Sequence, residues 1–402
     1  MKNKILFLLI SLFLCIQSIS ALEIKSTNAI LYNLNTDEVI YDKNSEEVIK
    51  IASLTKIMTA IVAIENMDDI KEEIVITYDM IKGLVELDAM VIGFKVGDVV
   101  TYEDLLYATL LPSAADATQA LAIGIAGSVD GYIELMNNKA RELGLNDTVF
   151  TNTSGLDYKD NHSTVKDVAI LLKYCLQNET FKKIYETRYY TSTTGIIMVS
   201  NLEKNLIRYN LDMDYIKGSK TGYTTLAGLC LSSTTNYNEI DYLLVTCGAD
   251  PKLNLPYNII DSDKIYKYYF ENYDKRNLLN INDVIVSIDN KYSKNKIDIL
   301  SNIDYSLYML QNDYDKLEYE YVGLNEVDIF TKDEIIGKYN IILNGEIIKT
   351  IDIYRPENIE FSIILFISNY LYIFIPGTIV ILLLIIGGIY AYKKSKRRLS
   401  RN

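Results

Sequence analysis

The sequence is poor in the side chains on which many hydrolytic sites depend. It contains one histidine, His162, and four cysteines among 402 residues. A Ser–His–Asp triad would need His162 to reach a serine, and the polar loop around it gives no sign of this, so we interpret His162 as a surface residue. A zinc site is equally short of ligands. We therefore expect no metal and no cofactor, and lysine remains as the available base.

The sequence also lacks a disulfide framework and an excess of positive charge. Cys15 lies in the N-terminal leader, which leaves Cys175, Cys230 and Cys247, an odd and sparse set. The net charge is −13, and the leader and the C-terminal tail carry lysines and arginines but no acidic residue, so the body between them is more acidic still. An acidic body argues against nucleic-acid binding.

Both ends of the chain have the pattern of membrane-directed segments. Residues 1–21 combine two lysines, an apolar run and small residues, which predicts a secretory signal peptide; the alternative, a retained anchor, is disfavoured by the short run. Residues 361–392 contain no charge and are long enough to predict a transmembrane segment. The basic tail, 393–402, is then cytoplasmic by the positive-inside rule. We expect a single-pass protein of the cell membrane with its body on the extracytoplasmic side.

The strongest candidates for chemistry are Ser53 and Lys56, at the start of an apolar segment. The run Ile57–Ile64 predicts a buried helix. Residues three apart share a helix face, so both side chains are expected to lie together in its first turn. A poorly solvated lysine favours its neutral form and can take the proton of a serine hydroxyl. Ser-x-x-Lys also begins at Ser163 and at Ser293, where polar surroundings predict solvated surface.

Two further motifs follow in order along the chain. Ser113 lies in Leu111-Pro112-Ser113-Ala114-Ala115-Asp116, and Lys220-Thr221-Gly222 occurs once. Ser-x-x-Lys, a second serine motif and Lys-Thr-Gly together form the signature of penicillin-interacting serine enzymes. With Asn152-Thr153-Ser154-Gly155-Leu156-Asp157 between them, residues 25–265 resemble the serine-type D-alanyl-D-alanine carboxypeptidases, the low-molecular-mass penicillin-binding proteins.

The resemblance implies a mechanism. Ser53 attacks the carbonyl between two terminal D-alanines and forms an acyl-enzyme, while Lys56 takes its proton. Ser113 connects Lys56 with the leaving amine, a role that suits a hydroxyl because it both donates and accepts. The backbone N–H groups of Ser53 and Tyr223 bind the oxyanion. The implied substrates are peptidoglycan stem peptides, and β-lactams are the implied inhibitors.

The resemblance also assigns substrate binding to the third motif. Lys220 supplies positive charge for the terminal carboxylate, Thr221 and Thr224 add hydroxyl contacts, and Gly222 permits a close approach of the strand. One position departs from the family pattern. The second motif usually reads Ser-x-Asn, whereas its third residue here is Ala115. An amide there helps to hold the lysine and the substrate, so we expect Ala115 to lower the rate without changing the reaction.

Two alternatives remain open. A β-lactamase shares the three motifs, but it would need a deacylating glutamate after the second motif, and residues 152–164 contain none. A catalytically weak penicillin-binding scaffold would act through its C-terminal domain, and Ala115 is its only support.

The predicted fold class is α+β, with an antiparallel sheet flanked by helices. Strands are expected at 29–34, 38–42, 227–233 and 242–247, and helices at 103–111, 130–143 and 163–176. Beyond residue 272, short alternating runs predict a small β-rich domain, which in this family commonly forms a stalk. We divide the chain into a signal peptide (1–21), a catalytic domain (22–271), a β-rich stalk domain (272–360), a transmembrane segment (361–392) and a basic tail (393–402).

Overall fold

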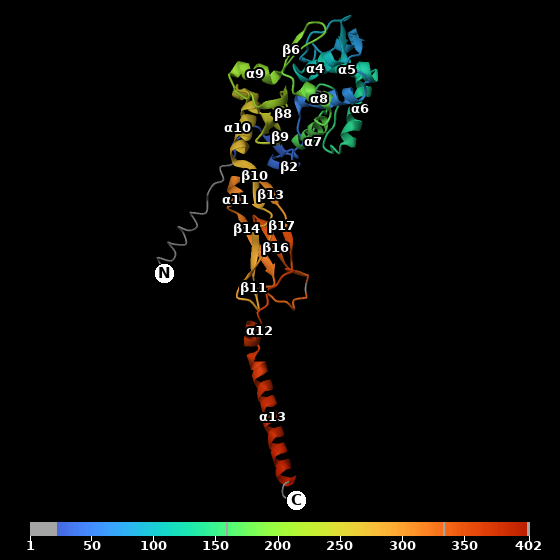
Figure 1. Cartoon of the computed structure of the whole chain (residues 1–402). Coiled ribbons are helices and arrows are strands. Elements are labelled where there is room, and N and C mark those ends of the chain that lie inside the picture. Colours follow the sequence, from blue (N-terminus) through green and yellow to red (C-terminus); the bar gives the residue numbers. More distant parts are fainter. Residues whose placement is uncertain (1–21, 158–159, 333, 400–402) are drawn as a thin grey trace, which may run out of the picture. The chain divides into compact units, whose positions relative to one another are not determined.

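The computed structural model describes residues 22–157, 160–332 and 334–399 (Figure 1). The chain forms two compact units, Met1–Glu271 and Asn272–Asn402. The predicted signal peptide lies outside the described residues. The roles given above to the individual segments stay predictions.

The first unit is built on a five-stranded sheet with the order β2-β1-β9-β8-β7. Every neighbouring pair in it is antiparallel, which confirms the predicted sheet type. Its strands are β1 (Asn28–Asn33), β2 (Glu38–Lys43), β7 (Ile216–Thr224), β8 (Gly228–Tyr237) and β9 (Ile240–Ala249). β7, which carries the Lys-Thr-Gly motif, is an edge strand of this sheet.

Helices cover both faces of this sheet. Leu243, Val245 and Cys247 of β9 belong to the main hydrophobic core together with the central helices, whereas Tyr242 packs against Tyr266 of α10, with ring centroids 6.4 Å apart. Successive residues of a strand point to opposite faces, so burial on both faces explains why this stretch is continuously apolar rather than alternating. Figure 1 shows α10 and α7 on opposite sides of β9.

The central helix of the main core of the first unit is α2 (Thr55–Glu65). Nine consecutive residues of α2, from Thr55 to Ala63, are buried, as predicted from its apolar sequence. The others are α3 (Tyr78–Ile81), α4 (Tyr102–Leu110), α5 (Ala115–Ala126), α6 (Val129–Glu142), α7 (Val165–Cys175), α8 (Glu179–Tyr185), α9 (Asn201–Tyr209) and α10 (Tyr257–Asn272). The predicted helices at 103–111, 130–143 and 163–176 correspond to α4, α6 and α7, within two residues at each end.

The smaller elements of this unit are two short two-stranded antiparallel sheets and two single 3-10 turns. They are β3 (Glu73–Val75) with β4 (Val99–Thr101), β5 (Tyr189–Thr191) with β6 (Ile197–Val199), η1 (Ala52–Leu54) and η2 (Pro251–Leu253).

The second unit is rich in β structure, as predicted, and ends in helices. Its strands are β10 (Tyr273–Leu279), β11 (Val284–Asn290), β12 (Ile297–Leu300), β13 (Tyr305–Leu310), β14 (Leu317–Gly323), β15 (Glu326–Val327), β16 (Ile335–Leu343) and β17 (Glu346–Tyr354). Two short helices, α11 (Gln311–Tyr314) and α12 (Ile363–Asn369), and the much longer α13 (Leu371–Leu399) complete it. Within α13, the segment Ile375–Lys396 is long and apolar enough to cross a membrane.

Candidate active site

Ser53 and Lys56 meet where η1 joins α2. Lys56 Nζ lies 2.9 Å from Ser53 Oγ and also donates to the backbone oxygen of Ser154 at 2.7 Å. The lysine side chain is buried, with 3% of its surface exposed. Burial lowers the pKa of Lys56 to about 7, while the charge of Asp116 acts in the opposite direction. A large fraction of Lys56 is therefore neutral near pH 7, and neutral Nζ can accept the proton of Ser53 Oγ.

The backbone around Ser53 is enclosed on two sides. Ala52 has φ +46°, in the left-handed region, and its carbonyl oxygen faces Gly155, which has φ +82°. A Cβ on Gly155 would lie 1.8 Å from that oxygen, so only glycine fits there. A Cβ on Gly222 of β7 would lie 3.1 Å from Ser53 N. β7 therefore approaches the backbone of Ser53 closely at Gly222.

The loop that supplies the Ser154 oxygen is held by its own hydrogen bonds. Asn152 Oδ1 accepts from the backbone N–H groups of Ser154 and Gly155, at 3.1 and 2.6 Å. Thr59 Oγ1 of α2 donates to the backbone oxygen of Thr153 at 2.7 Å. The loop is therefore fastened to the helix that carries Lys56. The sequence drew attention to this segment only through the family resemblance, and the contact between Lys56 and Ser154 was missed.

Ser113 lies at the sharp junction between α4 and α5. Its φ is +70°, and its side chain is buried. The junction is held by the Ala114 N–H, which donates to the Ala108 oxygen at 2.9 Å, and by Asn201 Nδ2, which donates to the Pro112 oxygen at 3.2 Å. Ser113 Oγ has no hydrogen-bond partner among the described residues. The predicted relay between Ser113 and Lys56 stays a prediction.

The residues after Ser113 hold a neighbouring loop. The Ala115 N–H donates to the Met90 oxygen at 2.7 Å. Buried Asp116 accepts from the backbone N–H groups of Ile92 and Gly93, at 3.1 and 3.0 Å. Asp116 therefore fixes the loop beside the second motif, a role that the sequence did not reveal. Its negative charge also reaches Lys56, as the direction of its effect on the lysine pKa indicates.

Lys220 projects from β7 into a buried environment. Its side chain is 1% exposed, and Nζ donates to the backbone oxygen of Thr221 at 2.9 Å. Burial, followed by repulsion from Lys56, lowers the pKa of Lys220 well below its ordinary value. The Thr224 hydroxyl oxygen accepts from the Ala227 N–H at 3.1 Å, and Tyr223 is 54% exposed. A carboxylate bound beside Lys220 would favour its charged form.

The other two Ser-x-x-Lys matches do not form a reactive pair. Ser163 is buried and its Oγ lies 2.7 Å from Thr148 Oγ1, so the prediction that it lies on the solvated surface was wrong. Ser163 forms an isolated antiparallel β-bridge with Ile49. Ser293 Oγ donates to the carboxylate of Glu360 at 2.9 Å. His162 Nδ1 lies 2.9 Å from the Asp160 backbone oxygen, in keeping with a loop residue.

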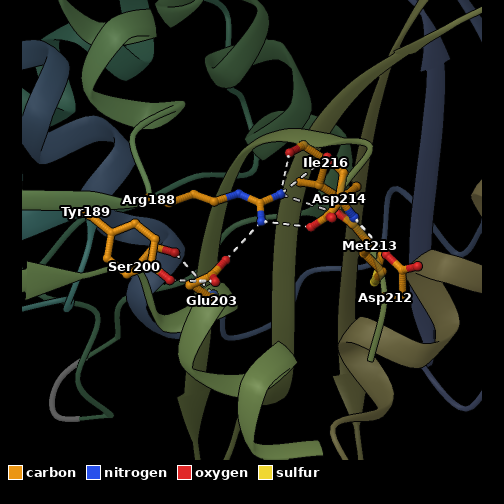
Figure 2. Close-up of polar contacts among 8 residues, drawn as sticks. All are labelled: Arg188, Tyr189, Ser200, Glu203, Asp212, Met213, Asp214 and Ile216. Carbon is orange, nitrogen blue, oxygen red and sulfur yellow. Dashed lines mark hydrogen bonds and ion pairs between the residues drawn. The ribbon is translucent and has the colours of Figure 1, made fainter. Parts of the chain in front are cut away.

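Arg188 holds the beginning of the strand that carries Lys220 (Figure 2). Its guanidinium lies 2.9 Å from the Glu203 carboxylate of α9 and donates to the Ile216 backbone oxygen of β7 at 3.1 Å. A weaker contact of 3.4 Å reaches Asp214. Tyr189 donates to the other Glu203 oxygen at 2.6 Å. These contacts join β5, α9 and β7 at the end of β7 that precedes Lys220.

Comparison with known proteins agrees with this geometry. The sequence profile described as D-alanyl-D-alanine carboxypeptidase matches residues 16–251, more than half of the chain. The chain belongs to the D-alanyl-D-alanine carboxypeptidase family. The predicted family is confirmed, and with it the assignment of the chain as a serine-type hydrolase.

Relatives of this family match the chain over different lengths. The D-alanyl-D-alanine carboxypeptidase DacF of Bacillus subtilis is 28% identical over 275 residues, which cover 68% of this chain and 67% of DacF. DacC of Escherichia coli is 33% identical over 205 residues, 49% of this chain and 50% of DacC. This chain thus spans about half of DacC and about two thirds of DacF.

Solved structures of the family share the fold. Penicillin binding protein 5 of Haemophilus influenzae superposes with a TM-score of 0.59 at 23% identity, covering 83% of this chain and 96% of that protein. The Streptomyces K15 DD-transpeptidase has a TM-score of 0.55 at 27% identity, covering 62% of this chain and 98% of that enzyme. The α+β fold class predicted from the sequence is therefore confirmed.

Proposed function

We propose that this family member is a DD-carboxypeptidase that removes the terminal D-alanine from peptidoglycan stem pentapeptides through an acyl-enzyme on Ser53. The observation that carries the proposal is the 2.9 Å contact between Ser53 Oγ and the Nζ of buried Lys56. Because the pKa of Lys56 is lowered to about 7, the pair contains both a nucleophile and its base. No histidine or metal is needed for this step.

Acylation begins when Ser53 Oγ attacks the carbonyl carbon between the two terminal D-alanines and its proton passes to Lys56 Nζ. The developing oxyanion is bound by the backbone N–H groups of Ser53 and Tyr223. The position of Gly222, close to Ser53 N, supports this pairing of strand and helix backbone. Oxyanion donors of this kind contribute roughly 3–4 kcal/mol each to transition-state stabilisation.

The leaving D-alanine takes a proton as the C–N bond breaks. We assign Ser113 to carry this proton from Lys56 to the leaving amine, which its buried and otherwise unpaired hydroxyl supports among the described residues. Lys220 binds the terminal carboxylate, with Thr221 and Thr224 beside it. Water then hydrolyses the ester at Ser53. A β-lactam would acylate Ser53 in the same way, and its release would be slow.

The C-terminal helix supplies a membrane anchor in this proposal. Ile375–Lys396 is long and apolar enough to cross a bilayer, and basic residues follow it at the end of the chain. The basic tail would then lie in the cytoplasm and the catalytic unit on the extracytoplasmic side, where peptidoglycan is found.

Two assays on the purified full-length protein test the proposal. The first measures D-alanine release from a defined pentapeptide, and the second measures covalent labelling by a fluorescent penicillin. A carboxypeptidase gives both release and lasting label. A β-lactamase would hydrolyse penicillin with rapid loss of label, and a scaffold would be labelled without releasing D-alanine. Either of the latter results would contradict the proposed function.

A further inference from the structure

The stalk domain presents apolar side chains at the end from which α12 begins. Ile329 and Phe330 lie at the tip of the turn 328–331 and are 38% and 59% exposed. Hydrogen bonds between residues of the turn itself hold its shape. The Asp328 N–H donates to Thr331 Oγ1 at 2.9 Å, and the Phe330 N–H donates to Asp328 Oδ1 at 2.7 Å. An ordered turn thus leaves two adjacent large apolar side chains exposed.

The turn is continuous with aromatic residues that lead to the membrane helix. Buried Tyr292 contacts Phe330 at a centroid distance of 6.3 Å and Phe366 of α12 at 5.2 Å. The Tyr292 hydroxyl lies 2.9 Å from that of Tyr370. Tyr370 directly precedes α13, and the apolar span begins at Ile375. Phe330 therefore belongs to an aromatic cluster that ends within a few residues of the proposed bilayer segment.

The base of the stalk is hydrogen-bonded to α12 and to the residues that directly precede α12. The Ser362 N–H donates to the Tyr292 backbone oxygen at 2.8 Å. Asn290 Nδ2 donates to the Glu360 oxygen at 2.9 Å, and Asn369 Nδ2 donates to the Lys291 oxygen at 3.3 Å. These bonds keep the turn 290–293 alongside the residues that enter the membrane.

The segment 291–296, which overlaps this turn, carries three lysines in an acidic chain. Lys291, Lys294 and Lys296 fall within six residues, and the protein as a whole carries a net charge of −13. Lys296 is paired with Asp289 at 3.2 Å. Lys291 is partly buried, with Nζ 5.7 Å from the centroid of the Tyr292 ring, and Lys294 is exposed. Lysines next to a membrane span are attracted to anionic lipid headgroups.

We propose that the turn 328–331, together with the segment 291–296, forms a second membrane contact of this protein. Ile329 and Phe330 enter the boundary between headgroups and acyl chains, and Lys291 and Lys294 lie at the lipid phosphates. Aromatic rings are well suited to this depth because one part of their surroundings is apolar and the other polar. The inference rests on the proposed anchoring by α13, and it makes the base of the stalk a part of the membrane interface.

The sequence contains no tryptophan, so one introduced tryptophan reports its own depth. We would place full-length Phe330→Trp in vesicles of phosphatidylcholine and phosphatidylglycerol with brominated acyl chains, which quench tryptophan at contact. The matched control is Tyr314→Trp, whose parent side chain is 51% exposed. Tyr314 and Leu324 flank opposite ends of β14, so the control lies at the far end of the stalk domain. Leu383→Trp, inside the span, reports the anchor itself.

We expect Leu383→Trp and Phe330→Trp to lose most of their emission in brominated vesicles and Tyr314→Trp to keep its emission. If Leu383→Trp is quenched and Phe330→Trp behaves like Tyr314→Trp, the second contact is overturned while the anchor stands. If Leu383→Trp is not quenched, both the membrane anchor and the second membrane contact are overturned. Adding Lys291→Gln and Lys294→Gln to Phe330→Trp should weaken the quenching. Unchanged quenching in that variant would overturn the lipid-binding role of the two lysines.

Discussion

Replacing Gly155 by alanine tests whether the loop behind Ser53 positions the nucleophile. Gly155 has φ +82°, and its added Cβ would lie 1.8 Å from the Ala52 oxygen. The left-handed conformation costs a non-glycine residue about 1–2 kcal/mol, and overpacking adds about 1–3 kcal/mol. Relief of the clash must move the Ala52–Ser53 backbone or the Ser154 oxygen by about 1 Å, which costs roughly 100-fold in rate when it misplaces a reacting group.

Gly144→Ala is the matched control. Gly144 has φ +71°, and a Cβ there would meet nothing within 4 Å, so this variant has the conformational cost without the clash. We expect Gly155→Ala to lose about 2–5 kcal/mol of unfolding free energy in urea and Gly144→Ala about 1–2 kcal/mol. The rate of penicillin labelling should fall roughly 100-fold in the first and stay unchanged in the second. Equal stability losses with equal labelling rates would refute the positioning role of this loop.

Three further predictions concern the base, the second motif and the edge strand. The rate of penicillin labelling should fall roughly tenfold per pH unit below the lowered Lys56 pKa of about 7 and level off above it, because only neutral Nζ accepts the proton. A labelling rate that is independent of pH, over a range where the protein stays folded, would exclude Lys56 as the base. Ala115→Asn should raise kcat/KM for pentapeptide hydrolysis about tenfold by adding a hydrogen bond; a decrease would mean that the packing around buried Ala115 leaves no room for an amide. Arg188→Leu should cost about 1–2 kcal/mol of stability, since half-buried Glu203 loses its positively charged partner and keeps only the Tyr189 hydroxyl. Exposed Arg141→Leu should cost little, and equal losses would contradict the role of Arg188 in holding β7.

Features that depend on local periodicity could be predicted from the sequence. The apolar run after Ser53 specified a buried helix, and Lys56 falls three residues after Ser53 on any helical path, so their contact follows from spacing. The apolar stretches at 227–233 and 242–247 were recognised as neighbouring strands and are β8 and β9. Thr101 followed by Asp104 caps α4 as a capping box, which is why the start of that helix was predicted within one residue.

Contacts between residues that are distant in the sequence could not be predicted in this way. The Lys56–Ser154 bond uses a backbone oxygen 98 residues away, and a carbonyl group has no sequence signature. No role was predicted for Asp116 from the sequence, yet its carboxylate fixes the loop at Ile92 and Gly93. Ser163 seemed exposed from its polar neighbours, but the fold buries it against Thr148. In each case, the partner is distant in the sequence.

The central claim is that Ser53 is the nucleophile, and the most direct measurement is the site of acylation. Full-length protein is treated with penicillin, and the covalent adduct is located by mass spectrometry of the intact chain and of its peptides. We predict one adduct, on the peptide that contains Ser53, none in Ser53→Ala, and a slowly formed adduct in Ser113→Ala. An adduct of undiminished yield in folded Ser53→Ala, or one located on Ser113, would contradict the account.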